Sequence, residues 1–439
     1  MSMNILVIGS GGREHALCLS FLKSGRVGKI YCAPGNAGIA AIAECVPIAA
    51  DDIEALSEFA SVHAIDITFV GGESPLGAGI VDHFEQRGLR IVGPSLAASR
   101  LESSKAFAKE FMRRHAIPTA AFRVASSAEE AVRALADGEF GDAETAVVVK
   151  ADGLAAGKGV VVALNRADAI AAVEGLGELA GREAASKIVL EECLSGSEIS
   201  LLMFVDGSEF ALMPASRDHK RIGDGDTGPN TGGMGTVTDA SLLTTEQLRE
   251  ILERVVRPTL LGCISEGFPF RGILFLGLMM TADGPKVLEY NVRFGDPETQ
   301  SILVRLQTDL VDICEAMLDG RLGELEIEWR AGSSATVVLA AAGYPQSPRK
   351  GDAIRGIEKA AAVPDVTIFH AGTALVSKKG ANTSDSELPS TVGEFVTSGG
   401  RVLGIAAVGE TLGEALAKAY SAVERIAWNG MQYRTDIGK

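Results

Sequence analysis

Two β-branched runs, at residues 147–149 and 160–162, enclose a loop that contains three glycines and two lysines. Glycine lets the backbone approach a ligand closely, and amide N–H and ammonium groups together can hold a polyphosphate. The spacing is not that of a P-loop, which runs GxxxxGK[ST] into a helix. The segment therefore predicts a phosphate-binding loop at Lys150, Gly157 and Gly159, although a flexible hairpin whose lysines face water would show the same pattern.

A second segment, at residues 286–298, combines strand-like alternation with charged and amide side chains. Since side chains alternate across a strand, Val287, Glu289, Asn291 and Arg293 should share one face. The opposite face would be apolar and would carry Leu288, Tyr290, Val292 and Phe294. Carboxylate and amide oxygens suit Mg²⁺ or Mn²⁺ carrying a nucleotide, and an arginine can clamp a carboxylate or phosphate. The alternative is an edge strand with a solvated polar face, but the apolar run at 272–280 predicts a buried neighbour.

Charged residues also gather at 216–221, just before a glycine-rich loop at 226–235. This arrangement is typical of a site for a polar substrate, although a solvated basic turn fits equally well. The N-terminal turn at 9–15 resembles a dinucleotide fingerprint, but its third glycine would fall at Glu14, which argues against nicotinamide. A phosphate at this helix start, helped by Arg13, remains consistent, and His15 is better explained by packing than by catalysis. No spacing assembles a covalent nucleophile.

The elements that would position these groups begin with alternating strands and helices in the first hundred residues. Strands expected at 5–8, 29–33, 65–71 and 89–93 predict a doubly wound parallel sheet, with polar turns converging at its carboxyl edge. A helix follows at 104–115, and residues 146–194 predict a small subdomain that leans towards antiparallel pairing. The last hundred residues predict strands at 335–341 and 402–408, a helix at 412–427 and a mobile polar loop at Ser377–Thr391.

Composition limits the classes of function. The 439 residues carry a formal charge of −16, which argues against nonspecific nucleic-acid binding, and no run is long enough to span a membrane. The six cysteines form no CxxC pair, so we expect reduced thiols in a cytoplasmic protein. The sequence predicts a soluble α/β enzyme of two to four domains.

Eight motifs, in order along the whole chain, resemble the glycinamide ribonucleotide synthetase (phosphoribosylamine–glycine ligase) family of the ATP-grasp superfamily. They are GSGGREHA at 9–16, PGNAG at 34–38, LESSKAF at 101–107, KADGLAAGKGV at 150–160, DHKR at 218–221, TGPNTGGMG at 227–235, NVRFGDPE at 291–298 and FHAGT at 369–373. The chain departs from the family pattern at Gly72, where a proline is usual, and at Ser103, where a glycine is usual, so we expect looser loops there.

The resemblance implies an α/β fold with three parts. These would be a Rossmann-like domain at 1–103, an ATP-grasp pair of subdomains at 104–330 with a lid at about 120–195, and a small C-terminal α+β domain at 331–439. The implied activity joins glycine to 5-phosphoribosylamine with ATP in purine synthesis. Rival interpretations are another ATP-grasp purine enzyme, either a carboxylase or a formate-dependent ligase, and a non-catalytic ATP-binding sensor. The association state stays open, with a monomer in transient contact with other purine enzymes as one option.

The same resemblance implies roles for individual residues. ATP would contact Lys105, Lys150, Gly157 and Gly159 through its phosphates and Glu191, Glu192, Leu194 and Glu198 through adenosine. The metal would bind Glu289 and Asn291. Glycine and phosphoribosylamine would lie among Gly11, Gly12, Arg13, Asn36, Glu73, Asp218 and Arg293, and the catalytic set would be Arg293, Asp218 and Lys220.

Overall fold

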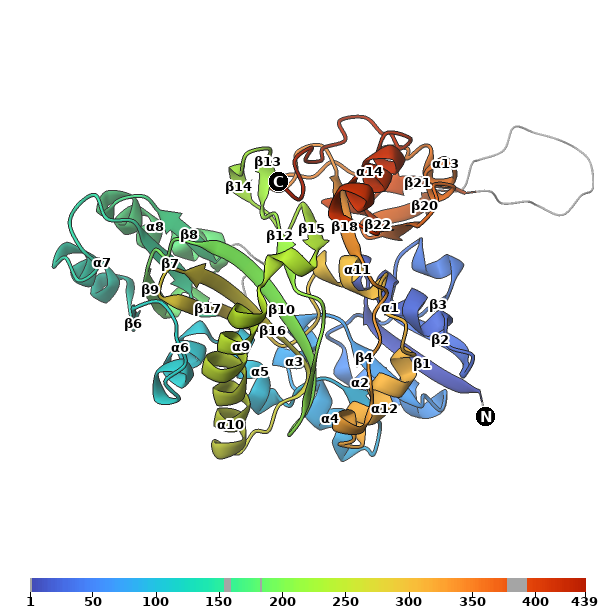
Figure 1. The fold of residues 1–439 in the computed structure, drawn as a ribbon, viewed down its shortest axis with the longest axis horizontal. Coiled ribbons are helices and arrows are strands. Elements are labelled where there is room, and N and C mark those ends of the chain that lie inside the picture. The colour runs from blue at the N-terminus through green and yellow to red at the C-terminus, as the bar shows by residue number, and fades with distance from the viewer. Residues whose placement is uncertain (1, 154–158, 182–183, 377–392) are drawn as a thin grey trace, which may run out of the picture.

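The computed structural model describes residues 2–153, 159–181, 184–376 and 393–439 of the chain. Gly157 and the loop predicted at Ser377–Thr391 lie outside these residues. In Figure 1 the N-terminal elements lie at the lower right, a small teal subdomain at the left and the C-terminal elements at the top, around a central sheet.

The N-terminal domain is the predicted doubly wound sheet. Its five strands run parallel in the order β3-β2-β1-β4-β5, with helices between them. The strands are β1 (Met3–Gly9), β2 (Val27–Pro34), β3 (Glu44–Cys45), β4 (Ile67–Val70) and β5 (Ile91–Val92), so the strand expected at 89–93 is shorter than predicted. The helical segments are α1 (Gly12–Leu22), η1 (Ile39–Ala41), α2 (Ile53–Val62), α3 (Glu73–Gly77), α4 (Ile80–Gln86) and α5 (Leu96–Ser103).

The turns after β1, β2 and β4 meet at the carboxyl edge of this sheet, as predicted. Gly35 N donates to Gly9 O at 3.0 Å and Gly71 N donates to Ile8 O at 2.9 Å. Gly71 has a steric reason to be glycine, because a Cβ there would lie 2.1 Å from Glu14 Oε1. The buried Glu14 carboxylate thus occupies the space between the turns.

The lid subdomain is an antiparallel sheet in the order β6-β9-β7-β8, which confirms the predicted pairing. Helix α6 (Lys105–Arg114) leads into it. Its elements are β6 (Phe122–Ala125), α7 (Ala128–Ala136), β7 (Val147–Ala151), β8 (Val160–Ala163), α8 (Arg166–Ala180), η2 (Ala184–Ser186) and β9 (Ile188–Glu192). The lid has a small core of its own, built mostly from alanine and valine, because α7 and α8 bury one face of the sheet.

The central sheet continues from the ATP-grasp segment into the C-terminal strands, in the order β17-β16-β10-β12-β15-β18-β22-β19. The ATP-grasp part contains β10 (Ser197–Asp206), β11 (Phe210–Leu212), β12 (Ser216–Asp218), β13 (Arg221–Gly223), β14 (Thr227–Asn230), β15 (Gly235–Thr238), β16 (Arg271–Thr281) and β17 (Gly284–Asn291). Its helical segments are η3 (Ala240–Leu242), α9 (Thr245–Ile251), η4 (Leu252–Val256), α10 (Arg257–Ser265), α11 (Glu298–Leu303), α12 (Leu310–Leu318) and η5 (Leu322–Glu324).

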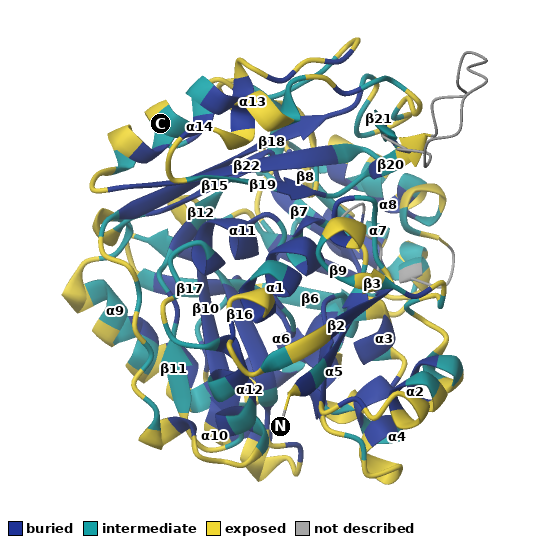
Figure 2. Ribbon diagram, turned by 90° about the vertical axis from the view of Figure 1, so that its right-hand side faces the viewer, coloured by how far each residue is buried: buried dark blue, intermediate teal, exposed yellow. Residues whose placement is uncertain are grey.

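The C-terminal part joins this sheet through the antiparallel pairing of β15 with β18 (Ser333–Ala340). The remaining elements are α13 (Ile357–Ala361), β19 (Val366–His370), β20 (Thr373–Val376), β21 (Glu394–Thr397), β22 (Arg401–Gly409) and α14 (Leu412–Val423). Figure 2 shows the strands of the central sheet buried, while helices such as α9 and α10 expose their outer faces. The central sheet therefore runs without a break from the ATP-grasp segment into the C-terminal strands.

Strand β17 departs from the simple alternation expected of it. Gly277 pairs with Glu289 while Leu278 pairs with Val287, so Leu288 is an extra, unpaired residue. Such a bulge reverses the side-chain alternation on one side of it relative to the other side. Val287 therefore packs in the hydrophobic core with Tyr290 and Val292, and Leu288 faces a cavity, the reverse of the prediction for these two positions.

The cysteines and His15 agree with their interpretation from the sequence. All six cysteines are free thiols, four of them buried. His15 is buried and its Nδ1 accepts a hydrogen bond from His370 N at 2.8 Å, which supports the packing interpretation. No helix in the described part of the chain is both long and apolar enough to cross a membrane.

Candidate active site

A cavity of about 390 Å³ lies between the N-terminal domain, the lid and the central sheet. It brings together half of the predicted site residues, from separate segments of the chain. The predicted residues that line it are Arg13, Glu73, Lys105, Lys150, Gly159, Glu191, Glu289, Asn291 and Arg293. Strand β17 stands at one end of the strand order, yet its polar face lines this cavity instead of open solvent.

Lysines from the lid and from α6 converge on one side of the cavity. Lys150 Nζ lies 2.8 Å from Glu191 Oε1, and Lys109 Nζ lies 2.7 Å from Glu191 Oε2. All three side chains are almost fully buried. Burial, together with the charge of Lys150, lowers the pKa of Lys109 to about 8. The cluster carries two ammonium groups for one carboxylate, which suits a polyanionic ligand.

The start of α6 is held against the glycine loop of the lid. Asp152, at the start of that loop, accepts hydrogen bonds from Lys105 N at 3.1 Å and from Ala106 N at 2.7 Å. Ser104 Oγ also donates to Asp152 at 2.9 Å. The first N–H groups of α6 are thus already paired with Asp152 and with Ser104 Oγ, and these contacts hold Lys105 at the lining of the cavity.

On β17, Glu289 and Asn291 present oxygen atoms to the same cavity. Burial alone would raise the pKa of Glu289, but the charges of Lys220, Lys150 and Lys105 hold it below its usual range. The carboxylate is therefore ionised and ready to accept a cation. The described residues contain no cluster of three or more His, Cys, Asp or Glu side chains suited to a metal. Two protein oxygens fit a divalent ion that takes its other ligands from nucleotide phosphates and water.

Arg293 is fixed by acidic partners from the N-terminal domain. Its Nε lies 3.2 Å from Glu73 Oε2, and its Nη2 lies 2.8 Å from Glu102 Oε1. Nη2 also donates to Asn291 Oδ1 at 3.1 Å. These contacts fix the orientation of the Arg293 guanidinium relative to the amide oxygen of Asn291.

The two departures from the family pattern leave these contacts intact. At Gly72 a Cβ would meet Arg13 Nη2 at 3.4 Å, an ordinary contact, so no close approach demands glycine there. Glu73 still begins α3 and still reaches Arg293. Ser103 ends α5 immediately before Ser104, whose side chain caps α6. Both exchanges are therefore compatible with the site geometry.

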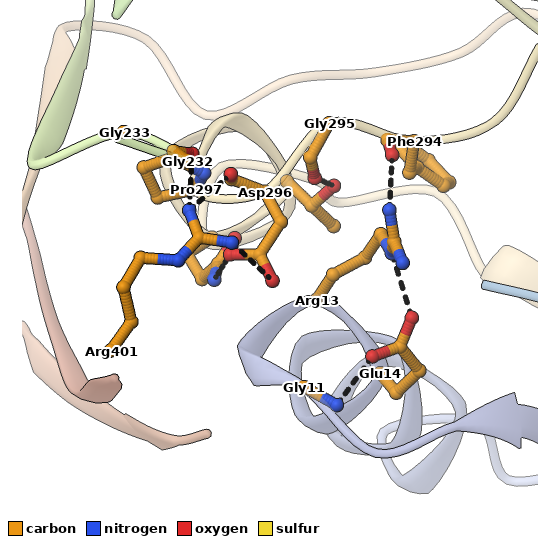
Figure 3. Close-up of polar contacts among 12 residues, drawn as sticks. Gly11, Arg13, Glu14, Gly232, Gly233, Phe294, Gly295, Asp296, Pro297 and Arg401 are labelled. Carbon is orange, nitrogen blue, oxygen red and sulfur yellow. Dashed lines mark hydrogen bonds and ion pairs between the residues drawn. The ribbon is translucent and has the colours of Figure 1, made fainter. Parts of the chain in front are cut away.

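At the far end of the cavity, arginines from the first and last domains flank one carboxylate (Figure 3). Arg401 Nη2 lies 3.4 Å from Asp296 Oδ2, and Arg401 Nη1 donates to Asp296 O at 2.6 Å. Arg13 pairs with Glu14 Oε1 at 2.7 Å and donates to Phe294 O at 2.9 Å. Burial opposes ionisation of Asp296, but Arg401 and Arg13 lower its pKa. This junction ties all three parts of the chain to the segment after β17.

Asp218 is the last residue of β12, and His219 and Lys220 follow it. Lys220 Nζ lies 3.3 Å from Glu198 Oε2, and despite partial burial the charges of Glu198 and Glu289 raise the pKa of Lys220. Burial and the neighbouring Glu298 carboxylate raise the pKa of Asp218 well above its usual range. Lys220 therefore interacts electrostatically with the cavity through Glu289, and Asp218 through Arg401, although neither catalytic candidate is in the lining.

Several other predicted residues lie outside the lining of the cavity in the described part of the chain. Gly11 caps α1 through its N–H, which donates to Glu14 Oε2, and a Cβ on Gly12 would meet Gln300 Nε2 at 2.6 Å. The Asn36 amide joins Ser10 O and His370 O, at 2.8 and 2.9 Å. Glu192 accepts from Ala121 N and Lys286 Nζ, while Leu194 is half-buried and Glu198 half-exposed.

The cavity also contains charged residues that the sequence did not single out. They are Glu102, Lys109, Asp296 and Arg401. One of them carried a usable signal, because Lys109 stands four residues after Lys105 and so shares its helix face. No sequence signal pointed to Arg401, because its partner Asp296 is more than one hundred residues away in the sequence.

The fold and this site define an ATP-grasp enzyme, in which a small lid and a central sheet face each other across a lysine-rich nucleotide cavity. The chain matches family models described as the phosphoribosylglycinamide synthetase N domain at residues 3–102, the ATP-grasp (A) domain at 103–299 and the C domain at 334–439. The chain therefore belongs to the phosphoribosylglycinamide synthetase family, whose curated members carry the name phosphoribosylamine–glycine ligase.

Relatives agree with this assignment over the whole chain. A phosphoribosylamine–glycine ligase of Pseudomonas aeruginosa is 47% identical, covering 99% of this chain and 97% of the relative. One from Brucella melitensis is 46% identical with the same coverage. The crystal structure of the Thermotoga maritima ligase is 36% identical with a TM-score of 0.82, covering 99% of this chain and all of that chain.

A more distant structure shares the fold alone. The biotin carboxylase domain of Hydrogenobacter thermophilus 2-oxoglutarate carboxylase is 16% identical with a TM-score of 0.72, covering 99% of this chain and 92% of that chain. That domain is in complex with MgADP, ADP and bicarbonate.

Proposed function

We propose that this enzyme joins glycine to 5-phosphoribosylamine, with ATP as the energy source, to give 5-phosphoribosylglycinamide, ADP and phosphate. The observation that carries the proposal is the single cavity that holds the lysines of the lid and α6 opposite Glu289 and Asn291. A nucleotide triphosphate needs this combination of cationic and cation-binding groups on two sides. Family membership supplies the identity of the two substrates.

The reaction needs ATP because a carboxylate is a poor electrophile. A glycine carboxylate oxygen attacks the γ-phosphorus of ATP, the bond to the bridging oxygen breaks and ADP leaves. The product is glycyl phosphate. The amine of 5-phosphoribosylamine then attacks its carbonyl carbon, the bond to the phosphate oxygen breaks and the nitrogen loses a proton. Positioning and charge neutralisation are the chief contributions an enzyme can make to such steps.

Each group of residues has a role in this scheme. Lys105, Lys150 and the loop through Gly157 and Gly159 hold the phosphates of ATP. Glu191, Glu192, Leu194 and Glu198 form the adenosine side, and Glu191 also keeps its two lysines in place. Glu289 and Asn291 would hold Mg²⁺ or Mn²⁺, which neutralises phosphate charge when bound.

The substrates lie on the other side of the cavity in this proposal. Arg293 orients a carboxylate or phosphate, and Asp218 and Lys220 act beside it. The remaining contacts come from Gly11, Gly12, Arg13, Asn36 and Glu73. Closure of the glycine loop excludes water, which would otherwise hydrolyse glycyl phosphate.

We also propose domain boundaries near 103 and 330 and a cytoplasmic location for the enzyme. The second boundary crosses a continuous sheet, because β15 pairs with β18. The C-terminal part therefore belongs to the framework of the site and is not a loosely tethered module.

A coupled assay for ADP tests the activity. ADP should form only when glycine and 5-phosphoribosylamine are supplied together with ATP. ADP release driven by bicarbonate or formate with another purine intermediate would favour the carboxylase or formate-dependent ligase. ATP binding without any substrate-dependent ADP would favour the sensor.

A further inference from the structure

The segment at residues 432–439, here called the clasp segment, lies across the β13–β14 hairpin. Figure 1 shows the chain end marked C beside β13 and β14. Arg434, whose side chain is 2% exposed, lies 2.6 Å from Asp226 Oδ1 of the hairpin and 2.7 Å from Asp436 Oδ1 of the clasp segment. A guanidinium this deeply buried and doubly paired is unusual outside a structural or ligand-binding role.

Further hydrogen bonds join the same two segments. Gly225 N donates to Asp436 Oδ2 at 2.8 Å, and Thr435 N donates to Asp224 Oδ1 at 2.8 Å. Arg434 lowers the pKa of the Asp436 carboxyl, mainly through its hydrogen bond. The clasp segment and the hairpin thus form one network of charge-assisted contacts.

The hairpin needs such support. β13 and β14 form a sheet of two strands, and every residue of β14 is exposed. An isolated two-stranded hairpin is marginally stable in water. The turn also holds Asp226 at φ 52°, a backbone region that non-glycine residues rarely adopt. The contacts of the clasp segment offset both disadvantages.

The clasp segment and the return side of the hairpin both contact the stretch from Asp218 to Lys220. Gly438 N donates to Nε2 of His219 at 3.1 Å, and His219 stands between Asp218 and Lys220. Burial and the charge of Arg434 lower the pKa of His219, which keeps its ring neutral and able to accept this bond. On the return side, Thr231 N donates to Lys220 O at 2.8 Å, and Gly232 lines the cavity.

We propose that the clasp segment positions the Asp218–Lys220 stretch for catalysis, with Arg434 as the positioning residue that closes it. This inference rests on the proposed function, because it concerns the same catalytic pair. Arg434 does not touch the cavity. Its effect passes through Asp226, the hairpin and His219.

The test compares Arg434→Met with Arg26→Met in the full-length enzyme. Arg26 is a matched control, since it also binds two acidic residues, Asp312 and Glu315, far from the hairpin. Arg434→Met should speed hydrogen exchange at residues 221–231 and admit trypsin cleavage after Lys220 and Arg221. It should also lower kcat about ten-fold or more while KM for ATP changes little, because misplacing a catalytic group costs rate more than nucleotide binding. Arg26→Met should change none of these.

Asp436→Asn is the second variant, in case Arg434→Met folds poorly, and it should show the same pattern more weakly. Arg434→Lys should restore part of kcat, since an ammonium keeps one ion pair but cannot fork to two carboxylates. Unchanged exchange at residues 221–231 in both variants would overturn the proposal, and so would faster exchange with wild-type kcat. Exchange and trypsin cleavage are read without substrates, so they stand even if the proposed reaction proves wrong.

Discussion

Lys109 and Glu191 form a buried ion pair at the edge of the nucleotide cavity, with Lys109 Nζ 2.7 Å from Glu191 Oε2. Lys109 also donates to Thr119 Oγ1, which donates to Val287 O beside the bulge of β17. Lys150 completes the arrangement by donating to Leu288 O at 3.1 Å. The pair therefore connects α6, the lid and the strand of the predicted metal ligands.

Replacing Lys109 with methionine should weaken ATP binding without unfolding the protein. Glu191 would keep Lys150 as its partner, so no buried carboxylate is left unpaired. Lys150 would then be held more tightly by Glu191 and be less available to a phosphate. We expect KM for ATP to rise about ten-fold, or about 1.4 kcal/mol, with a smaller effect on kcat. Lys418→Met is the control, because Lys418 pairs with Asp365 and Glu414 away from the cavity lining. An unchanged KM for ATP in Lys109→Met would refute this role.

The pKa of Lys109 predicts a pH dependence. Burial lowers this pKa from 10.5 to about 8, so the folded protein loses the proton as pH rises through about 8 while the unfolded chain keeps it to about 10.5. The unfolded state then binds more protons, and this group makes the free energy of unfolding increase with pH between those values. Function should move the other way, with KM for ATP rising above about pH 8. A pH profile of KM should show this inflection in the wild type and lose it in Lys109→Met.

Glu289→Gln should abolish turnover while the fold is kept. The substitution removes the ionised carboxylate that the surrounding lysines stabilise, and a bound metal contributes several kcal/mol to charge stabilisation. We expect kcat to fall about 100-fold or more, and Mg²⁺ to stop improving ATP affinity in calorimetric titrations. Glu266→Gln is the control, since Glu266 pairs with Arg114 away from the cavity lining. Turnover near the wild-type rate at saturating Mg²⁺ would exclude Glu289 as a ligand.

The contact between His15 and His370 predicts sensitivity to acid. Burial lowers the pKa of His15 to about 3 and that of His370 to about 4. The unfolded chain takes up protons below its ordinary pKa of 6.5 while the folded chain does not, so stability falls as pH falls through this window. At about pH 5 each histidine should cost about 2 kcal/mol of unfolding free energy.

His15→Asn keeps an acceptor for His370 N and should lose about 2 kcal/mol less than the wild type between about pH 7 and pH 5 in urea unfolding. Equal losses in both proteins would contradict this prediction, because they would show that the protonation of His15 does not differ between the folded and unfolded states.

Local pattern was enough to identify much of the fold. The strands and helices of the N-terminal domain, the lid around the glycine loop and the last helix follow from apolar periodicity and glycine-rich turns within short windows. Their ends shifted by a few residues, as with α14, which was expected at 412–427 and ends at Val423. Hydrogen bonding at an element's end depends on neighbours that the local pattern does not contain.

The candidate site was predictable only where its residues are contiguous. Glu289, Asn291 and Arg293 could be grouped because they stand at alternate positions within five residues, and the cavity does bring them together. The bulge at Leu288 could not be foreseen, because it depends on how β17 pairs with β16. It reversed the expected faces of Val287 and Leu288 while leaving the later positions correct.

By itself, then, the sequence determined the class of chemistry, since each motif carries its side-chain types and spacing within a dozen residues. Tertiary structure alone decided which charges pair. Lys109 with Glu191, Arg401 with Asp296 and Arg434 with Asp226 join positions far apart in the chain. The physical reason is that ion pairing and burial depend on distance in space, which the folding of sheets and domains sets and local spacing does not contain.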